Sequence, residues 1–268
     1  IHWTFALLIG WILMIFFAAG KTTAEAVGGV AFVLALFVCI VLHEFGHALT
    51  ARRYGVKTRD ITLLPIGGVA RLESMPEKPM QEFWVAVAGP AVNVVIAAFL
   101  FVILLLIDGA NQLFQVEWFH GGFLAQLMLV NLLIVAFNML PAFPMDGGRV
   151  LRALLSIRMG RRRATVIAAN IGQAMAIIFG IVGLFIFHNP FLIFIAIMVY
   201  LGAQAEASQV ELQSALDGLK VKDAMMTRFR TLAAGDTLGK AVEELLAGSQ
   251  HDFPVLDSGA LVGVLRRE

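Results

Sequence analysis

Two histidines lie four residues apart in the segment His43-Glu-Phe-Gly-His47, an H-E-x-x-H pattern. On a helix, residues four apart share one face, so both imidazoles can bind the same ion. Zn²⁺ accepts such nitrogens, and Glu44 stands beside the pair to hold and deprotonate a water molecule. Histidine and glutamate are costly inside an apolar helix, so a functional role is favoured over a chance match. The pattern predicts a hydrolytic metal site.

Two histidines leave a catalytic zinc ion short of one protein ligand. Cys39 lies about 12 Å along the helix from His47, which is too far for both to share an ion, so we interpret it as apolar filler. Asp146 is the better candidate, because two prolines break the helix before it and two glycines after it permit a tight turn. The alternative is a helix-ending turn with an exposed carboxylate.

The composition around these residues indicates a membrane. Hydrophobic residues make up 59% of the 268 residues and charged residues only 15%, and the mean hydropathy is +0.84. A compact soluble domain could not hide so much apolar surface, which excludes an ordinary cytosolic enzyme and a disordered chain. No basic groove with interleaved aromatic residues is present in the sequence, which argues against nucleic acid as a partner. The single cysteine excludes an intramolecular disulfide.

Six apolar stretches approach the ~20 residues that a spanning helix needs. They predict a polytopic α-helical membrane protein, with helices at residues 3–19, 26–49, 83–107, 122–140, 164–187 and 190–205. If the loops alternate between sides, one side receives twelve basic residues and the other receives Lys21 alone. By the positive-inside rule the basic side is cytoplasmic. We expect a plasma or inner membrane protein with both termini and the active site toward the cytoplasm.

A shorter apolar segment, residues 56–73, lies between the second and third predicted helices. It is too short to span as a helix, and it predicts a β-hairpin or a re-entrant loop that protein or a water-filled cavity covers. Within residues 66–70, Gly67, Gly68 and Val69 could form an exposed strand edge that holds an opened substrate segment by β-augmentation. The alternative is a structural hairpin that closes the cytoplasmic mouth.

The composition changes after about residue 205. We predict a transmembrane domain over residues 1–205, a linker helix over 206–220 and a small α/β module over 221–268. The module contains a predicted helix at 237–246 and two predicted strands at 252–256 and 260–265. Asp257-Ser258-Gly259 between the strands is typical of a hairpin turn.

Four motifs together resemble the site-2 protease family of intramembrane metalloproteases. They are H-E-F-G-H at 43–47, G-G at 67–68, A-G-P-A-V-N at 88–93 and N-x-x-P-x-x-P-x-D-G-G-R at 138–149. The resemblance implies that His43, His47 and Asp146 bind one zinc ion and that Glu44 is the catalytic base. It also implies hydrolysis of peptide bonds in transmembrane segments of substrate proteins within the lipid bilayer, often after a first cut by another protease.

The C-terminal segment 221–268 resembles the first part of a CBS domain, through V-K-D-A-M-M at 221–226 and L-V-G-V-L at 261–265. That resemblance implies regulation by an adenine nucleotide, although such domains work in pairs and only part of one is expected here. A cytoplasmic interaction or dimerisation module is an equal alternative.

Two asparagines could donate to the oxyanion that forms during hydrolysis. Asn93 ends the A-G-P-A-V-N run, and Asn138 opens the proline-rich run. For both, the alternative is a polar side chain that bridges helices. Two rival functions stay open, a metal or ion transporter with the same His/His/Asp site and a catalytically inactive membrane scaffold. Glu44 discriminates, because a transport site does not need a carboxylate that is not a ligand.

Overall fold

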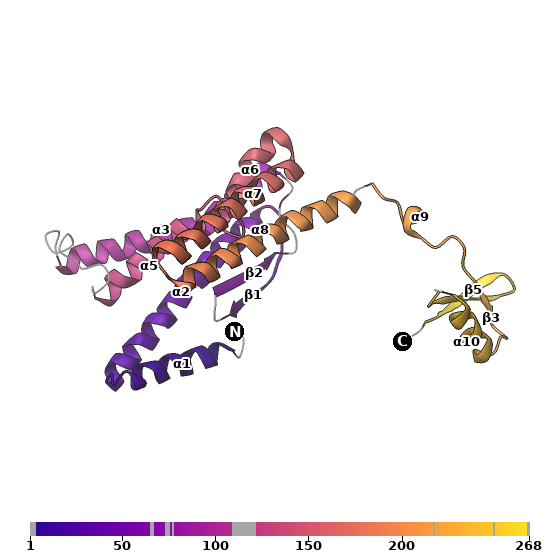
Figure 1. Cartoon of the computed structure of the whole chain (residues 1–268), viewed down its shortest axis with the longest axis horizontal. Helices are drawn as coiled ribbons and strands as arrows, with labels where there is room; N and C mark the ends of the chain where they lie inside the picture. The colour runs from indigo at the N-terminus through magenta and orange to yellow at the C-terminus, as the bar shows by residue number, and fades with distance from the viewer. Residues whose placement is uncertain are drawn as a thin grey trace. The chain divides into compact units, whose positions relative to one another are not determined.

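Long apolar helices dominate the structure, a computed structural model that describes residues 4–64, 67–72, 76, 78–108, 122–216, 218–248 and 250–266. The chain divides into two compact units, residues 1–214 and 215–268. The described residues of the first unit form helices and one β-hairpin, and this unit contains every predicted site residue (Figure 1).

Within the described residues, four helices are long and apolar enough to cross a membrane. They are α2 (Thr23–Arg53), α3 (Pro79–Asp108), α7 (Arg161–Ile181) with its π-helical continuation η1 (Val182–Ile186), and α8 (Pro190–Leu216). The first and fourth predicted spans correspond to α1 (Thr4–Ala18) and α5 (Phe123–Asn138), which have 15 and 16 residues. At 1.5 Å per residue these reach about 24 Å or less, short of a hydrocarbon core of about 30 Å. The total of six spans stays a prediction.

The outward faces of the long helices are apolar. Val95 and Phe99 on α3, and Ile177 and Ile178 on α7, are each more than half exposed. Soluble proteins rarely expose large contiguous apolar surfaces, whereas lipid hydrocarbon covers them readily. The chain is therefore a polytopic membrane protein, as its composition predicts.

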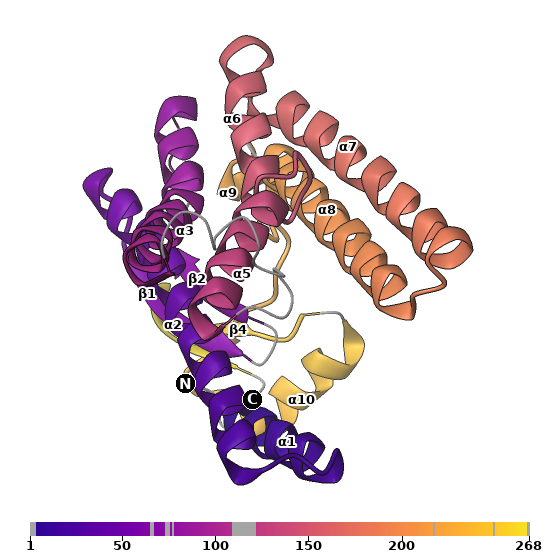
Figure 2. The ribbon, with the colours of Figure 1, turned by 90° about the vertical axis from the view of Figure 1, so that its left-hand side faces the viewer.

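Two helical groups meet at α3. α2, α3 and α5 enclose a buried cluster made of Cys39, Ala97, Leu100, Leu104, Ala125, Leu127 and Met128. On another side of α3, α6 (Asp146–Met159) packs against it and against α7 (Figure 2). α8 approaches the turn before α6 closely, because a Cβ on Gly202 would lie 2.8 Å from Cγ of Pro144. Ala142, Phe143 and Met145 of the segment between α5 and α6 are buried against α7 and α8.

The predicted hairpin over residues 56–73 is confirmed as a pair of strands. β1 (Thr58–Leu64) and β2 (Gly67–Leu72) are antiparallel, with Thr62 opposite Val69. The hairpin follows α2, and both strands contact that helix (Figure 1). Residues 65 and 66, the latter at one end of the predicted substrate edge, lie outside the described residues. Re-entry of the hairpin into the membrane stays a prediction.

The second unit starts near the end of α8, after Ser214, whereas the sequence predicts the end of the transmembrane domain at 205. Much of the predicted linker helix over 206–220 is the last part of α8, which ends at Leu216. The helix continues because residues 206–216 include no Gly or Pro that would end it earlier. The three-part division into domains stays a prediction.

After α8, the described residues of the second unit form a small sheet and two helices, α9 (Val221–Ala224) and α10 (Leu238–Ala247). β3 (Leu232–Ala233) lies parallel to β4 (Phe253–Asp257), and β4 is antiparallel to β5 (Ala260–Leu265). Ser258 and Gly259 have φ of 49° and 83°, as a tight two-residue hairpin turn requires. The predicted helix and strand hairpin are confirmed, and the likeness to a CBS domain stays a prediction.

Asp236 ties β3 to the start of α10. Its carboxylate accepts hydrogen bonds from Nζ of Lys240 at 2.9 Å and from the backbone N–H of Ala233 at 2.8 Å. These bonds, that from Lys240 foremost, lower the pKa of Asp236 below its ordinary value. A lowered pKa in the folded state adds stability above the unfolded pKa of about 3.9, and this stability is lost as the pH falls through the folded pKa.

We therefore expect the Ala233 amide to lose protection against hydrogen exchange as the pH falls below about 4. Asp236→Asn should already reduce this protection at neutral pH and make it less sensitive to acid. Hydrogen exchange of the full chain, read by mass spectrometry, measures both effects. Asp252→Asn, at an exposed position of the same unit, serves as the control. Equal acid sensitivity in the two variants would contradict the assignment.

Candidate metal centre

Both histidines of α2 pack against α3 at a glycine, where α3 has no side chain. His43 and His47 lie one turn apart on α2, and each is 5% exposed. Gly46 leaves room for α3, because a Cβ there would lie 2.7 Å from the carbonyl oxygen of Ala88. A Cβ at Gly89 would collide with Nε2 of His47 and lie 2.7 Å from Nε2 of His43. The two glycines therefore let the imidazoles lie directly on α3.

α3 also sets the orientation of both rings. Nδ1 of His43 lies 2.6 Å from Oδ1 of Asn93, and Nδ1 of His47 lies 2.7 Å from the backbone carbonyl oxygen of Val85. These oxygens can only accept, so Nδ1 carries the proton and donates in each ring. A neutral imidazole protonated at Nδ1 presents a lone pair at Nε2. Metal-binding histidines are commonly held in this way.

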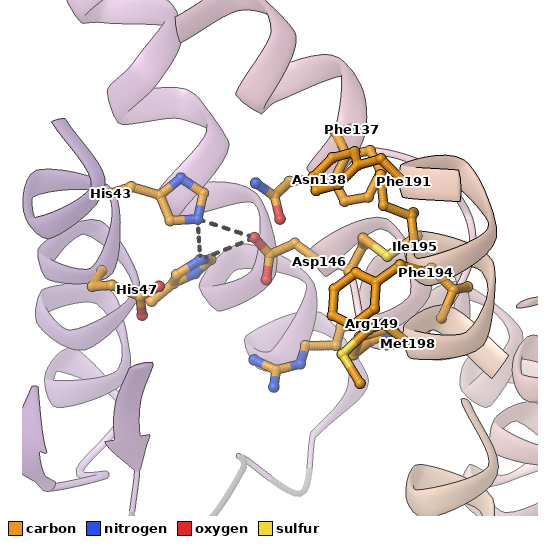
Figure 3. A pocket seen from close by; sticks show the side chains of 14 residues that line it. His43, His47, Phe137, Asn138, Asp146, Arg149, Phe191, Phe194, Ile195 and Met198 are labelled. Carbon is orange, nitrogen blue, oxygen red and sulfur yellow. Dashed lines mark hydrogen bonds and ion pairs between the residues drawn. The ribbon is translucent and has the colours of Figure 1, made fainter. Parts of the chain in front are cut away.

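Asp146 reaches the same point from the other side. After α5 the chain turns through residues 139–145, and Asp146 begins α6. Gly148 lets the turn fold tightly onto α6, because a Cβ there would lie 2.6 Å from backbone atoms of the turn. The carboxylate is buried, and its Oδ2 lies 3.1 Å from Nε2 of His47 and 3.2 Å from Nε2 of His43 (Figure 3).

Three electron-pair donors thus face one another. The two Nε2 atoms are 3.0 Å apart, and each lies within 3.2 Å of the carboxylate oxygen. Two lone pairs and a negative charge repel at such distances unless a cation lies among them. A tetrahedral zinc ion with bonds of about 2.0–2.1 Å separates its ligand atoms by about 3.3 Å, close to the spacing observed. The donor set fits one Zn²⁺, and the described part of the chain contains no second group of this kind.

A cavity of about 530 Å³ opens beside the three side chains. Glu44 and Arg149 line it together with the metal-binding group. The opposite wall is apolar and comes from α8, with Phe191, Phe194, Ile195, Met198 and Val199 (Figure 3). A pocket with apolar walls and a few convergent ionisable groups is typical of a site that binds an apolar ligand and acts on it.

Asn93 is completely buried, and both ends of its amide are engaged. Oδ1 faces His43, and Nδ2 donates to Oδ1 of Asn131 on α5 at 2.7 Å. Asn131 in turn donates to the carbonyl oxygen of Leu127 at 2.8 Å and lies 3.5 Å from Sγ of Cys39. These contacts favour support of His43 by Asn93 over donation to an oxyanion. Asn131 was not predicted, although an amide side chain in the middle of an apolar helix is a signal that could have found it.

The remaining predicted site residues lie at the cavity and in the hairpin. Asn138 lines the cavity beside Asp146, and its Nδ2 donates to a carbonyl oxygen of its own helix at 3.1 Å (Figure 3). Gly67, Gly68 and Val69 lie in β2 and pair with β1. Their roles in substrate binding stay predictions.

Apolar spanning helices and a buried His/His/Asp group beside a cavity define the class of membrane-embedded metalloproteins. The model of peptidase family M50 matches residues 31–120 and 111–182. This chain therefore belongs to peptidase family M50.

Its relatives are consistent with that family. It is 38% identical over 236 residues to a zinc metalloprotease of Methanocaldococcus jannaschii, which covers 88% of this chain and 66% of that protein. It is 31% identical over 242 residues to the protein Rip3 of Mycobacterium tuberculosis, which covers 86% of this chain and 60% of Rip3. The chain thus spans about two thirds of the length of these relatives or less.

A solved structure adds the fold. The site-2 protease from Methanocaldococcus jannaschii aligns with a TM-score of 0.55 and 36% identity, over 85% of this chain and 93% of that chain. The resemblance to site-2 proteases that the sequence motifs carry is confirmed by this match and by the family assignment.

The contact at Gly89 generates a prediction about metal affinity. Gly89→Ala places a methyl group against both Nε2 atoms, so the histidines can no longer approach Asp146 as they do. We expect zinc affinity to fall by at least about tenfold, the lower end of the range for residues that orient metal ligands. Gly28→Ala is the matched control, because a Cβ at Gly28 of α2 meets nothing within 4 Å. Competition with a zinc chelator measures both, and equal affinities would contradict the packing argument.

Proposed function

We propose that this chain is an intramembrane zinc endopeptidase that hydrolyses peptide bonds in transmembrane segments of substrate proteins. The observation that carries the proposal is that His43, His47 and Asp146 meet and, together with Glu44, line a largely apolar cavity. Membership of peptidase family M50 and the likeness to a zinc metalloprotease support the same activity.

In this proposal His43, His47 and Asp146 hold the zinc ion. Asn93 keeps His43 in its metal-binding orientation through the 2.6 Å contact at Nδ1, and the Val85 carbonyl does the same for His47. When bound in such a site, zinc supplies Lewis acidity and lowers the pKa of a water molecule toward neutrality.

Glu44 is the proposed general base. It follows His43 in the chain and lines the same cavity, so it is placed to accept a proton from the attacking water. The hydroxyl group adds to the carbonyl carbon, and Glu44 returns the proton to the amide nitrogen as the peptide bond breaks. Negative charge that develops on the carbonyl oxygen requires nearby donors. Asn138, whose side chain lines the cavity, is our candidate for one of them.

A substrate helix must open before its amides can react, because its hydrogen bonds are satisfied internally. We propose that β2, through Gly67, Gly68 and Val69, pairs with the opened segment as an added strand. The position of the hairpin directly after α2, which carries the histidines, supports this role.

We also propose how the chain is arranged in the membrane. Six spans, with α1 and α5 among them, place both termini and the catalytic site toward the cytoplasm of a plasma or inner membrane, with the hairpin re-entering on that side. The twelve basic residues of one set of loops, against Lys21 in the other, support this orientation.

For the C-terminal unit we propose a CBS-like regulatory role. Its motifs and its small sheet flanked by a helix support binding of an adenine nucleotide or dimerisation of the protease through this unit. Either event would act on a cytoplasmic extension of the helix that lines the cavity, since α8 leads into the unit.

Glu44→Gln tests the function directly. We expect cleavage of a single-span substrate in detergent or liposomes to fall by about 10²–10⁴-fold, because the general base is lost, while zinc content stays at that of the native protein. Chelation of zinc should abolish cleavage in the native protein, and added zinc should restore it.

The outcome separates the proposal from its rivals. A transporter would keep moving metal across liposomes after Glu44→Gln, and a scaffold would neither bind zinc tightly nor cleave. Unimpaired cleavage by the variant would refute the role of Glu44.

Proline substitutions test the strand edge. Alternate residues of a strand direct their N–H groups to the same side, so Gly68→Pro with Ala70→Pro removes two donors from one side of β2 and Val69→Pro removes one from the other. We expect the proline substitutions that remove N–H groups pointing away from β1 to abolish cleavage and to leave zinc binding intact. Full cleavage by both sets in folded protein would exclude the added-strand model.

A further inference from the structure

Arg152 is buried within the helical unit although it carries a full charge. It lies in α6 and is 2% exposed. Its Nε donates to Oε1 of Glu82 at 2.7 Å, and its Nη1 donates to Oε2 of Glu206 at 3.0 Å. Its guanidinium carbon lies 5.0 Å from the centroid of the Phe143 ring. The sequence suggested only a basic residue on the cytoplasmic side, whereas the structure gives it three partners in three other segments.

The Glu82 contact joins Arg152 to the helix that orients the histidines. Glu82 is 2% exposed and lies in the first turn of α3, three residues before Val85. Residues three apart share a face of a helix. The Val85 carbonyl is the acceptor for Nδ1 of His47, so a shift of this end of α3 moves the group that sets the ring of His47.

The Phe143 contact joins Arg152 to the turn that delivers the carboxylate. Phe143 is 0% exposed and lies three residues before Asp146. A guanidinium over an aromatic face is attracted to it, more strongly where water is excluded. Because α6 begins at Asp146 and contains Arg152, one side chain fixes this helix and the turn before it relative to α3.

The Glu206 contact joins Arg152 to α8, whose residues 191–199 include the apolar wall of the cavity. The Glu206 side chain is 25% exposed and that of Glu82 is 2% exposed, so water reaches only the contact with α8. The contact with Glu206 can therefore be altered with less disturbance of the interior than the contact with Glu82.

Stability alone is a poor explanation for such a group, because the cost of removing charges from water offsets much of their attraction. A planar guanidinium with five donors can hold two carboxylates in fixed directions, which a lysine cannot. We propose that Arg152 is a positioning residue of the metal centre. Through Glu82 and Phe143 it sets the distance from Asp146 to His43 and His47, and through Glu206 it sets the position of α8 over the cavity.

Cobalt binding tests the first part without any measurement of cleavage. The proposal rests on the proposed function only through the metal ion, and Co²⁺ in place of Zn²⁺ reports its coordination by visible absorption. Arg152→Lys keeps the positive charge but loses the planar guanidinium that can donate to two carboxylates at once. We expect it to weaken Co²⁺ binding by about 10–100-fold, as for other residues behind metal ligands, and to change the spectrum. Arg158→Lys, at an exposed position of the same helix, should change neither.

A pair of variants separates positioning from charge neutralisation. Arg152→Met leaves Glu82 buried without its partner, and Glu82→Gln with Arg152→Met removes that charge as well. We expect the double variant to recover thermal stability but not Co²⁺ affinity. Native affinity and spectrum in the double variant or in Arg152→Lys would overturn the proposal, because neutralisation of Glu82 would then be the whole role of Arg152.

Glu206→Gln tests the second part. It weakens only the α8 contact, so we expect KM for a single-span substrate to rise by about three- to tenfold with kcat and the Co²⁺ spectrum unchanged. An unchanged KM would overturn the role assigned to α8. If the native protein cleaved no substrate, the proposed function would fail while the cobalt results on Arg152 still stood or fell by themselves.

Discussion

At Gly46 the backbones of α2 and α3 approach so closely that a Cβ has no room, and at Gly89 the imidazoles of His43 and His47 occupy the space that a Cβ would need. Val85 and Asn93 lie one turn before and one turn after Gly89, and from there they reach the Nδ1 atoms of the two histidines. The close contact between α2 and α3 therefore also determines which nitrogen of each imidazole carries the proton. A bulkier residue at this crossing separates the helices and removes both acceptors together.

Burial in the helical unit gives these polar contacts their weight. Asn93 and Asn131 have 0% exposure, so each unmade hydrogen bond would leave a polar group without water, at a cost of about 1–3 kcal/mol. The chain His43, Asn93, Asn131 and the Leu127 carbonyl continues until every amide end has a partner. This continuity locks the ring of His43 to two helices other than its own and removes the freedom to rotate that an isolated histidine would have.

Features that follow from the local sequence pattern could be predicted, whereas contacts between segments far apart in the sequence could not. The spacing of His43 and His47 fixes a shared helix face, and the apolar runs and turn residues predict the long helices, the β1–β2 hairpin and the second unit's turn. Asp146 could be proposed from broken helix geometry, but only the fold brings it within 3.2 Å of the histidines. The contacts of Asn131 with Asn93 and Cys39, and those of Arg152 with Glu82 and Glu206, join residues 38 to 92 positions apart, and no local periodicity encodes such contacts.

The wall that α8 presents to the cavity would determine which substrates the proposed protease accepts. Phe191, Phe194, Ile195 and Met198 follow the spacing of a single helical stripe, and their side chains offer no hydrogen-bond donor. In the proposed protease, such a surface discriminates between apolar side chains by their volume, with about 1–3 kcal/mol for each methylene group that fits or fails to fit. The proposed protease would therefore accept many apolar sequences of similar bulk and reject a charged side chain, which would lose its water there.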